Sequence, residues 1–105
     1  MSGISVEQLA QWRASGKNFV LLDVREPFEL QASSLTEALH IPMRQIPARF
    51  QELDRNAEIA VLCHYGERSA HVARFLSAQG FASVHNVAGG IDAYAKRVDA
   101  TIPRY

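Results

Sequence analysis

Short apolar runs that alternate with segments of helical periodicity constrain the fold of this chain more than any other feature. Residues 18–24 and 58–62 are nearly continuous runs rich in Val, Leu and Ile, and residues 83–87 are predicted as a third strand. Runs of this length and continuity are typical of strands buried on both faces of a parallel sheet. Because helical segments separate them, the sequence predicts an α/β fold with a mostly parallel central sheet flanked by helices.

The segments between these runs carry helix signals. Ser5 and Gln8 have the spacing of a capping box, and Gly80 is typical of a helix end. The tail after residue 98 has no periodicity. Helices are predicted over residues 5–16, 25–31, 47–53, 68–80 and 91–98, with a further short strand over residues 38–41.

Length and composition limit the possible functions. A chain of 105 residues suits a single domain over residues 1–105. Basic and acidic residues balance at 11 each, and no apolar run approaches the length of a membrane span, so we expect neither nucleic acid nor membrane as a partner. The start of the chain does not resemble a signal peptide, and a single cysteine cannot form an internal disulfide. We therefore expect a cytoplasmic location, where thiols stay reduced.

Four segments with chemically notable residues follow predicted strands. They are residues 23–25, 42–44, 63–68 and 89–90, which together contain one cysteine, three arginines and two adjacent glycines. In open parallel sheets, ligands bind beyond the carboxyl ends of the strands. These segments are therefore expected to meet at one edge of the sheet and to form a site there.

The single cysteine, Cys63, comes at the end of an apolar run and just before a predicted helix. Backbone amides of such a loop, with Gly66 at its bend and the helix N-terminus behind it, form a cradle for an anion such as a thiolate, a persulfide or an oxyanion. Arg68 adds a permanent positive charge. The alternative is a structural cysteine, since free cysteine is among the most buried residue types.

The segment "CHYGERS" resembles the active-site loop of the rhodanese, or sulfurtransferase, family. Three other blocks agree with the family in order and spacing, namely "LLDVREPFE", "ALHIP" and "FLSAQGFASVHNVAGGIDAY", so that the resemblance covers about residues 4–97. The departures, "SSL" at 33–35, "TEA" at 36–38 and Tyr94 in place of a frequent tryptophan, lie outside the cysteine loop. The tail "VDATIPRY" is similar to the ending of rhodanese domains that serve sulfur-carrier activation.

This resemblance implies a rhodanese-like fold and a transfer of sulfane sulfur through a persulfide on Cys63. The donor would be thiosulfate or a persulfide, and the acceptor cyanide in vitro or a thiol or sulfur-carrier protein in vivo. Neither a cofactor nor a metal is implied, and the histidines lack metal-ligand spacing with Cys63. The implied active-site loop comprises Cys63, His64, Tyr65, Gly66, Glu67, Arg68 and Ser69, supported by Asp23 and Arg25.

Within this loop the resemblance implies a role for each side chain. Arg68 would hold an anionic donor, Gly66 would serve the turn, and His64 and Tyr65 would line the mouth of the site. Glu67 would tune the local charge. Asp23 and Arg25 would brace the loop, face the pocket or form an ordinary surface ion pair. Arg44 is a weaker candidate for the pocket.

Two other functions remain open from the sequence. A cysteine-based phosphatase or arsenate reductase needs five residues between its cysteine and its arginine, whereas four residues separate Cys63 from Arg68. The shorter loop is expected to be too tight for phosphate. A non-catalytic rhodanese-like binding module is the second alternative, although many such modules lack the cysteine that this chain keeps.

Overall fold

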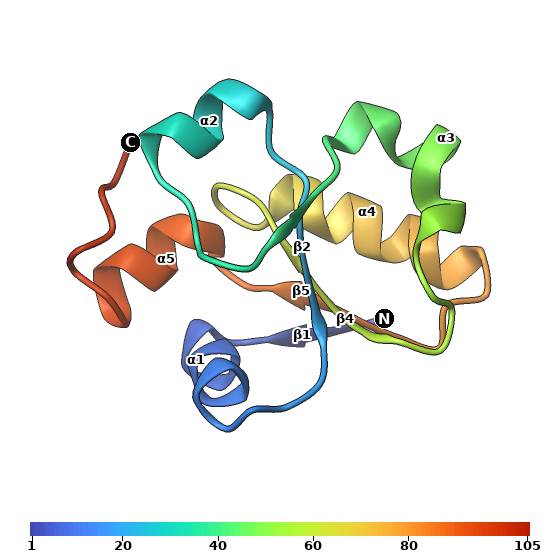
Figure 1. Cartoon of the computed structure of the whole chain (residues 1–105), viewed down its shortest axis with the longest axis horizontal. Helices are drawn as coiled ribbons and strands as arrows, with labels where there is room; N and C mark the ends of the chain where they lie inside the picture. The colour runs from blue at the N-terminus through green and yellow to red at the C-terminus, as the bar shows by residue number, and fades with distance from the viewer.

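The computed structural model describes all 105 residues and contains one sheet of five parallel strands (Figure 1). The strands are β1 (Ser2–Ile4), β2 (Val20–Asp23), β3 (Leu39–His40), β4 (Glu58–Leu62) and β5 (Ser83–Val87). The helices are α1 (Val6–Ala14), α2 (Pro27–Ala32), α3 (Ile46–Arg49), α4 (Glu67–Ala78) and α5 (Gly90–Arg97). The predicted α/β fold with a parallel central sheet is confirmed.

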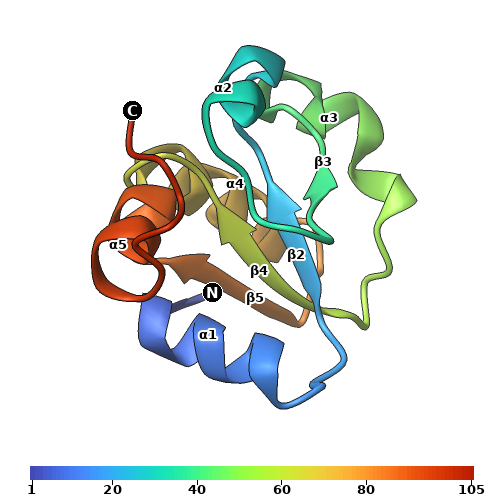
Figure 2. The ribbon, with the colours of Figure 1, turned by 60° about the vertical axis from the view of Figure 1, so that its left-hand side comes forward.

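The strand order is β1-β5-β4-β2-β3, which places β4 at the centre of the sheet. Figures 1 and 2 show α4 on one side of the sheet and α1 with α5 on the other. Alternate residues of β4 therefore enter two different cores: Ile59 and Val61 pack in the core beneath α4, and Ala60 and Leu62 pack in the core beneath α1 and α5. Burial on both faces explains why this strand reads as a continuous apolar run.

The N-terminal strand β1 was not predicted from the sequence. It has three residues, two of them exposed, so it carries no apolar run. Its backbone nevertheless pairs with β5, with Ser2 opposite His85 and Ile4 opposite Val87. The capping box that starts α1 is confirmed, because Ser5 Oγ accepts from the Gln8 amide at 3.1 Å and Gln8 Oε1 accepts from the Ser5 amide at 2.8 Å.

The helix predicted over residues 47–53 is interrupted in the structure. Helix α3 ends at Arg49, and Phe50–Glu52 continues as a 3₁₀ turn. The Leu53 amide donates to the Phe50 carbonyl at 3.1 Å, which closes the tighter turn.

No helix is long and apolar enough to cross a membrane.

The register of the sheet brings the ends of β2 and β4 together. Asp23 pairs with Leu62 on one side and with His40 on the other, and the Val24 amide donates to the Leu62 carbonyl at 3.0 Å. Cys63 follows directly after β4, so it leaves the sheet beside the segment that runs from β2 into α2. The carboxyl edge of the sheet thus brings the cysteine loop and α2 side by side.

Candidate active site

The Cys63 thiol lies at the bottom of the loop between β4 and α4. Its sulfur accepts the Gly66 amide at 3.1 Å and lies 3.2 Å from the hydroxyl of Ser69 in the first turn of α4. The residue is only 1% exposed, and it lines none of the three surface cavities. The loop amide and the helix N-terminus favour negative charge at this position.

The two adjacent glycines after β5 hold the loop in place. Ile91 and Asp92, in the first turn of α5, donate their amides to the carbonyls of Cys63 at 2.9 Å and His64 at 3.1 Å. This approach requires glycine, because a Cβ at Gly90 would lie 2.4 Å from the His64 carbonyl oxygen. Gly66 has φ +106°, a left-handed conformation that glycine adopts without strain. The predicted meeting of residues 63–68 with residues 89–90 is observed.

A polar residue of β5 orders the Ser69 hydroxyl. Asn86 Nδ2 donates to the Gly66 carbonyl at 3.1 Å, which leaves Asn86 Oδ1 to accept from Ser69. Ser69 has one hydroxyl proton, and it uses this proton in its hydrogen bond to Asn86 Oδ1. The Cys63 thiol is therefore the donor to Ser69 Oγ when it is protonated.

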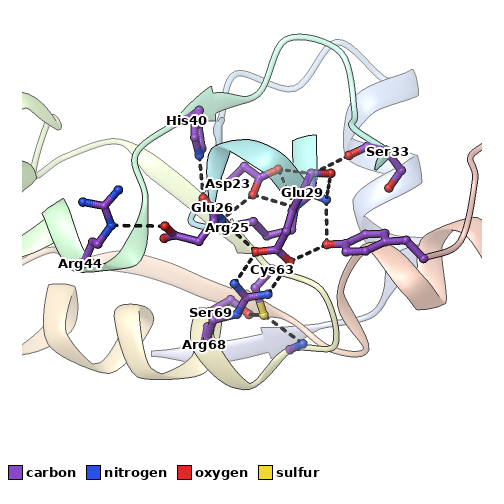
Figure 3. A network of polar contacts seen from close by, with 12 residues as sticks. Asp23, Arg25, Glu26, Glu29, Ser33, His40, Arg44, Cys63, Arg68 and Ser69 are labelled. Carbon is purple, nitrogen blue, oxygen red and sulfur yellow. Dashed lines mark hydrogen bonds and ion pairs between the residues drawn. The ribbon is translucent and has the colours of Figure 1, made fainter. Parts of the chain in front are cut away.

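Arg68 does not present a free guanidinium to the site. Its two terminal nitrogens donate to the two carboxylate oxygens of Glu29 at 2.7 and 2.8 Å, and Figure 3 shows this pair beside Cys63. Hydrogen bonding to Arg68 lowers the pKa of Glu29 to about 2, and the same contact raises the pKa of Arg68. The charge that the sequence assigned to donor binding is thus paired with a carboxylate from α2.

Asp23 and Arg25 form a buried ion pair. Both are fully buried, and the shortest contact, from Arg25 Nη2 to Asp23 Oδ2, measures 2.7 Å. Arg25 also donates to the carbonyls of Glu29 at 3.3 Å and Ser33 at 2.9 Å (Figure 3). Although burial opposes its charge, the hydrogen bonds to Asp23 and Tyr105 raise the pKa of Arg25. The burial contradicts the ordinary surface ion pair that the sequence left open, and the contacts show that Arg25 ties α2 to the end of β2.

The C-terminal residue reaches the same network. The Tyr105 hydroxyl donates to Glu29 Oε2 at 2.7 Å and accepts from Arg25 Nη1 at 3.0 Å. Its ring stacks on His64 with 3.8 Å between centroids, and Tyr65 stacks on the other face of His64 at 3.8 Å. Burial raises the pKa of Tyr105 to about 12. The C-terminal tail and the cysteine loop are therefore packed together.

The remaining candidates, Glu67 and Arg44, lie at the surface. Glu67 is exposed. Arg44 pairs with Glu26 at 3.2 Å with its side chain 65% exposed, and Figure 3 shows it apart from Cys63. No group of three or more His, Cys, Asp or Glu side chains is arranged to hold a metal ion.

Sequence reasoning missed three residues of this site. Asn86 carries a usable signal, since it is a polar residue within a predicted buried strand. The only signal for Glu29 is its position, four residues after Arg25 in a predicted helical turn. Tyr105 carries no signal, because it lies in a segment without periodicity.

Comparison with known proteins identifies related chains. The family model described as a Rhodanese-like domain matches residues 5–97. A protein named Sulfurtransferase from Allochromatium vinosum is 34% identical over 93 residues, which cover 89% of this chain and 87% of that protein. The Rhodanese-like/PpiC domain-containing protein 12, chloroplastic, of Arabidopsis thaliana is 44% identical over 89 residues, which cover 81% of this chain but only 30% of that protein.

A solved structure agrees with the fold over its whole length. The rhodanese-like domain protein from Staphylococcus aureus superposes with a TM-score of 0.85 at 28% sequence identity. The match covers 100% of this chain and 99% of that one.

Proposed function

This chain belongs to the rhodanese-like family, and from that premise we propose that it is a sulfurtransferase whose single cysteine, Cys63, carries the sulfur. The observation that carries the proposal is the setting of the thiol. Cys63 Sγ accepts the Gly66 amide at 3.1 Å at the start of α4. A sulfur anion in this position gains both the hydrogen bond and the positive end of the helix dipole.

The first half of the reaction loads the cysteine. The Cys63 thiolate attacks the outer sulfur of thiosulfate or the terminal sulfur of a persulfide, and a new sulfur–sulfur bond forms. The old sulfur–sulfur bond breaks, and its electron pair leaves with sulfite or with the donor thiolate. Cys63 then carries one extra sulfur as a persulfide anion, and the total charge is unchanged.

The second half unloads it. An acceptor anion, such as cyanide or a thiolate, attacks the outer sulfur of the persulfide and takes it, and the electron pair of the broken bond returns to Cys63. Because the chain has one cysteine, no internal thiol resolves the persulfide. The acceptor is a separate molecule, which we propose to be a thiol or a sulfur-carrier protein in the cell. A reducing compartment such as the cytoplasm suits this need for a free thiol.

Ser69 supports both states of the sulfur. In the resting thiol its oxygen accepts from Cys63, and once the thiol is deprotonated the hydroxyl turns from Asn86 to donate to the sulfur anion. The His64 side chain has no such contact with the sulfur. Because the attacking group is the thiolate itself, the proposed mechanism assigns no general base on the enzyme.

The proposal is tested by thiosulfate:cyanide sulfurtransferase activity in the wild type and in Cys63→Ser. Thiocyanate formation is expected in the wild type and is expected to be lost in the variant, whose fold is checked by circular dichroism and thermal melting. A folded serine variant that keeps most of the activity would contradict the persulfide on Cys63. A wild type without activity toward any donor would favour the non-catalytic binding module.

The same proteins separate this function from phosphatase chemistry. Four residues lie between Cys63 and Arg68, and Arg68 is held by Glu29, so p-nitrophenyl phosphate is not expected to be hydrolysed. Hydrolysis by the wild type that disappears in Cys63→Ser would overturn the sulfurtransferase proposal.

A further inference from the structure

The guanidinium of Arg68, which is the positive charge beside the sulfur, is already paired with a carboxylate. Both terminal nitrogens of Arg68 face Glu29, at 2.7 and 2.8 Å, in the two-pronged geometry that makes arginine–carboxylate pairs strong. A thiosulfate dianion that used Arg68 would have to take the place of this carboxylate.

Glu29 is held in position from three directions. Besides Arg68, the Glu26 amide donates to Oε1 at 2.9 Å and the Tyr105 hydroxyl donates to Oε2 at 2.7 Å. Its side chain is 7% exposed. The carboxylate is therefore a fixed part of the site rather than a flexible surface group.

The sulfur below this pair is closed to solvent. Cys63 is 1% exposed and lines no cavity, and Figure 3 shows Glu29 and Arg68 beside it. A donor thus approaches a place where Glu29 already neutralises the neighbouring cation. Small anions therefore gain little attraction from Arg68 there.

From this arrangement we propose that Glu29 is a specificity-determining residue, which selects against strongly anionic sulfur donors by occupying Arg68. The favoured donors carry their sulfane sulfur with little negative charge, as in a persulfide on a thiol without a neighbouring acid group. This proposal rests on the proposed sulfur transfer. The effect of Glu29 on the electrostatic potential at Cys63, however, can be measured without any transfer.

The first experiment alkylates Cys63 with iodoacetate, an anion, and with iodoacetamide, its neutral analogue. The rate constant for iodoacetate divided by that for iodoacetamide, both measured at one pH, does not depend on the thiolate fraction. This ratio reports the electrostatic potential at the sulfur and rises as the potential becomes more positive. In Glu29→Gln, which keeps the shape and removes the charge, the ratio is expected to rise by at least about fivefold at low ionic strength. An unchanged ratio in the folded variant would overturn the proposal.

Glu26→Gln is the matched control. It removes the same charge from the start of the same helix, but its carboxylate pairs with Arg44 and not with Arg68. Its ratio is expected to stay within about twofold of the wild type, because this half-buried charge is paired with the exposed Arg44 and is partly screened. An equal rise in both variants would show a general charge effect and would contradict a specific role for Glu29.

The wild type itself provides a test that does not depend on the stability of the variant. If Glu29 neutralises Arg68, only the loop amide and the helix N-terminus attract the anion, and the wild-type ratio exceeds that of N-acetylcysteinamide, a small uncharged thiol, by no more than about twofold. A wild-type ratio several times higher would show that Arg68 acts as a free cation and would overturn the proposal.

Steady-state kinetics then connect the charge to donor choice. Glu29→Gln is expected to lower the KM for thiosulfate, a dianion, by a larger factor than the KM for benzenethiosulfonate, a monoanion. Equal factors for the two donors would contradict selection by charge. If alkylation responds as expected but no donor gives sulfur transfer, the proposed function fails while the role of Glu29 in the potential at Cys63 stands.

Discussion

At the scale of single residues, Glu29 links the charge of the site to the stability of the fold. Its pKa lies at about 2, below the ordinary value of 4.5, chiefly because Arg68 donates to it. Burial opposes this shift, but the amide of Glu26 and the hydroxyl of Tyr105 add to it. The carboxylate is therefore ionised at neutral pH.

Acid titration of stability tests this account. A group whose pKa is lower in the folded state stabilises the fold above its unfolded pKa, and this contribution disappears as the pH falls toward the folded pKa. The free energy of unfolding is therefore expected to fall more steeply from pH 4.5 to pH 2 in the wild type than in Glu29→Gln. The difference in slope corresponds to about one proton taken up on unfolding.

Urea unfolding at a series of pH values measures both curves. Glu58, whose pKa also lies at about 2, chiefly because Ser83 donates to it, is present in both proteins and cancels. Parallel curves would show that Arg68 does not hold Glu29 in solution.

At the scale of elements, the cysteine loop is held between two helix N-termini. The start of α4 supplies Ser69 beside the sulfur, and the start of α5 binds the loop carbonyls through Ile91 and Asp92. Gly90 makes the second contact possible, because a Cβ there would lie 2.4 Å from the His64 carbonyl oxygen and 2.5 Å from that of Cys63. The loop geometry thus depends on the close approach of α5.

We expect Gly90→Ala to lower the stability by about 2 kcal/mol or more and the transfer rate by roughly tenfold. The alanine adds both strain at φ +62° and a backbone clash that displaces the loop. Gly16→Ala is the control, since Gly16 has φ +74° but no atom within 4 Å of an added Cβ. It is expected to cost about 1 kcal/mol and to leave transfer intact. Similar activity in the two variants would contradict the role of the α5 contact.

At the scale of the whole molecule, the C-terminus returns to the carboxyl edge of the sheet, and Figures 1 and 2 show it beside α2. Tyr105 there contacts three partners from two parts of the chain, the segment from β2 into α2 and the cysteine loop. Its hydroxyl lies between Glu29 and Arg25, and its ring covers His64. The last residue of the tail is therefore part of the packing around the site.

Two variants separate the contributions of Tyr105. Tyr105→Phe keeps the ring and is expected to cost about 1.5 kcal/mol, the lower end of the range for a hydrogen bond to a charged group, because the position is partly exposed. Tyr105→Ala also loses the stacking and is expected to cost about 2 kcal/mol in all. Urea unfolding measures both, and two variants as stable as the wild type would show that the tail does not pack on the loop in solution.

The sequence predicts the parts of this architecture that depend on local pattern. Continuous burial of β2 and β4 and the capping box of Ser5 produce recognisable signals. The resemblance to the rhodanese family follows from the loop at Cys63 together with three other blocks that agree with the family in order and spacing. The pairing of Glu29 with Arg68 depends on the position of α2 relative to α4 in the folded chain. The placement of Tyr105 depends on the path of a tail that has no periodicity. Neither is encoded in a local pattern, and β1 was missed because edge pairing needs no apolar run.

The most direct test of the central proposal is the intact mass of the protein after incubation with a sulfur donor. We expect one added sulfur atom in the wild type and none in Cys63→Ser, and we expect cyanide to remove it with release of an equal amount of thiocyanate. Thiosulfate is used at high concentration, because Glu29 disfavours it, alongside a persulfide donor. A folded, reduced wild type that gains no sulfur from either donor, or a serine variant that gains it equally, would contradict a persulfide carried on Cys63.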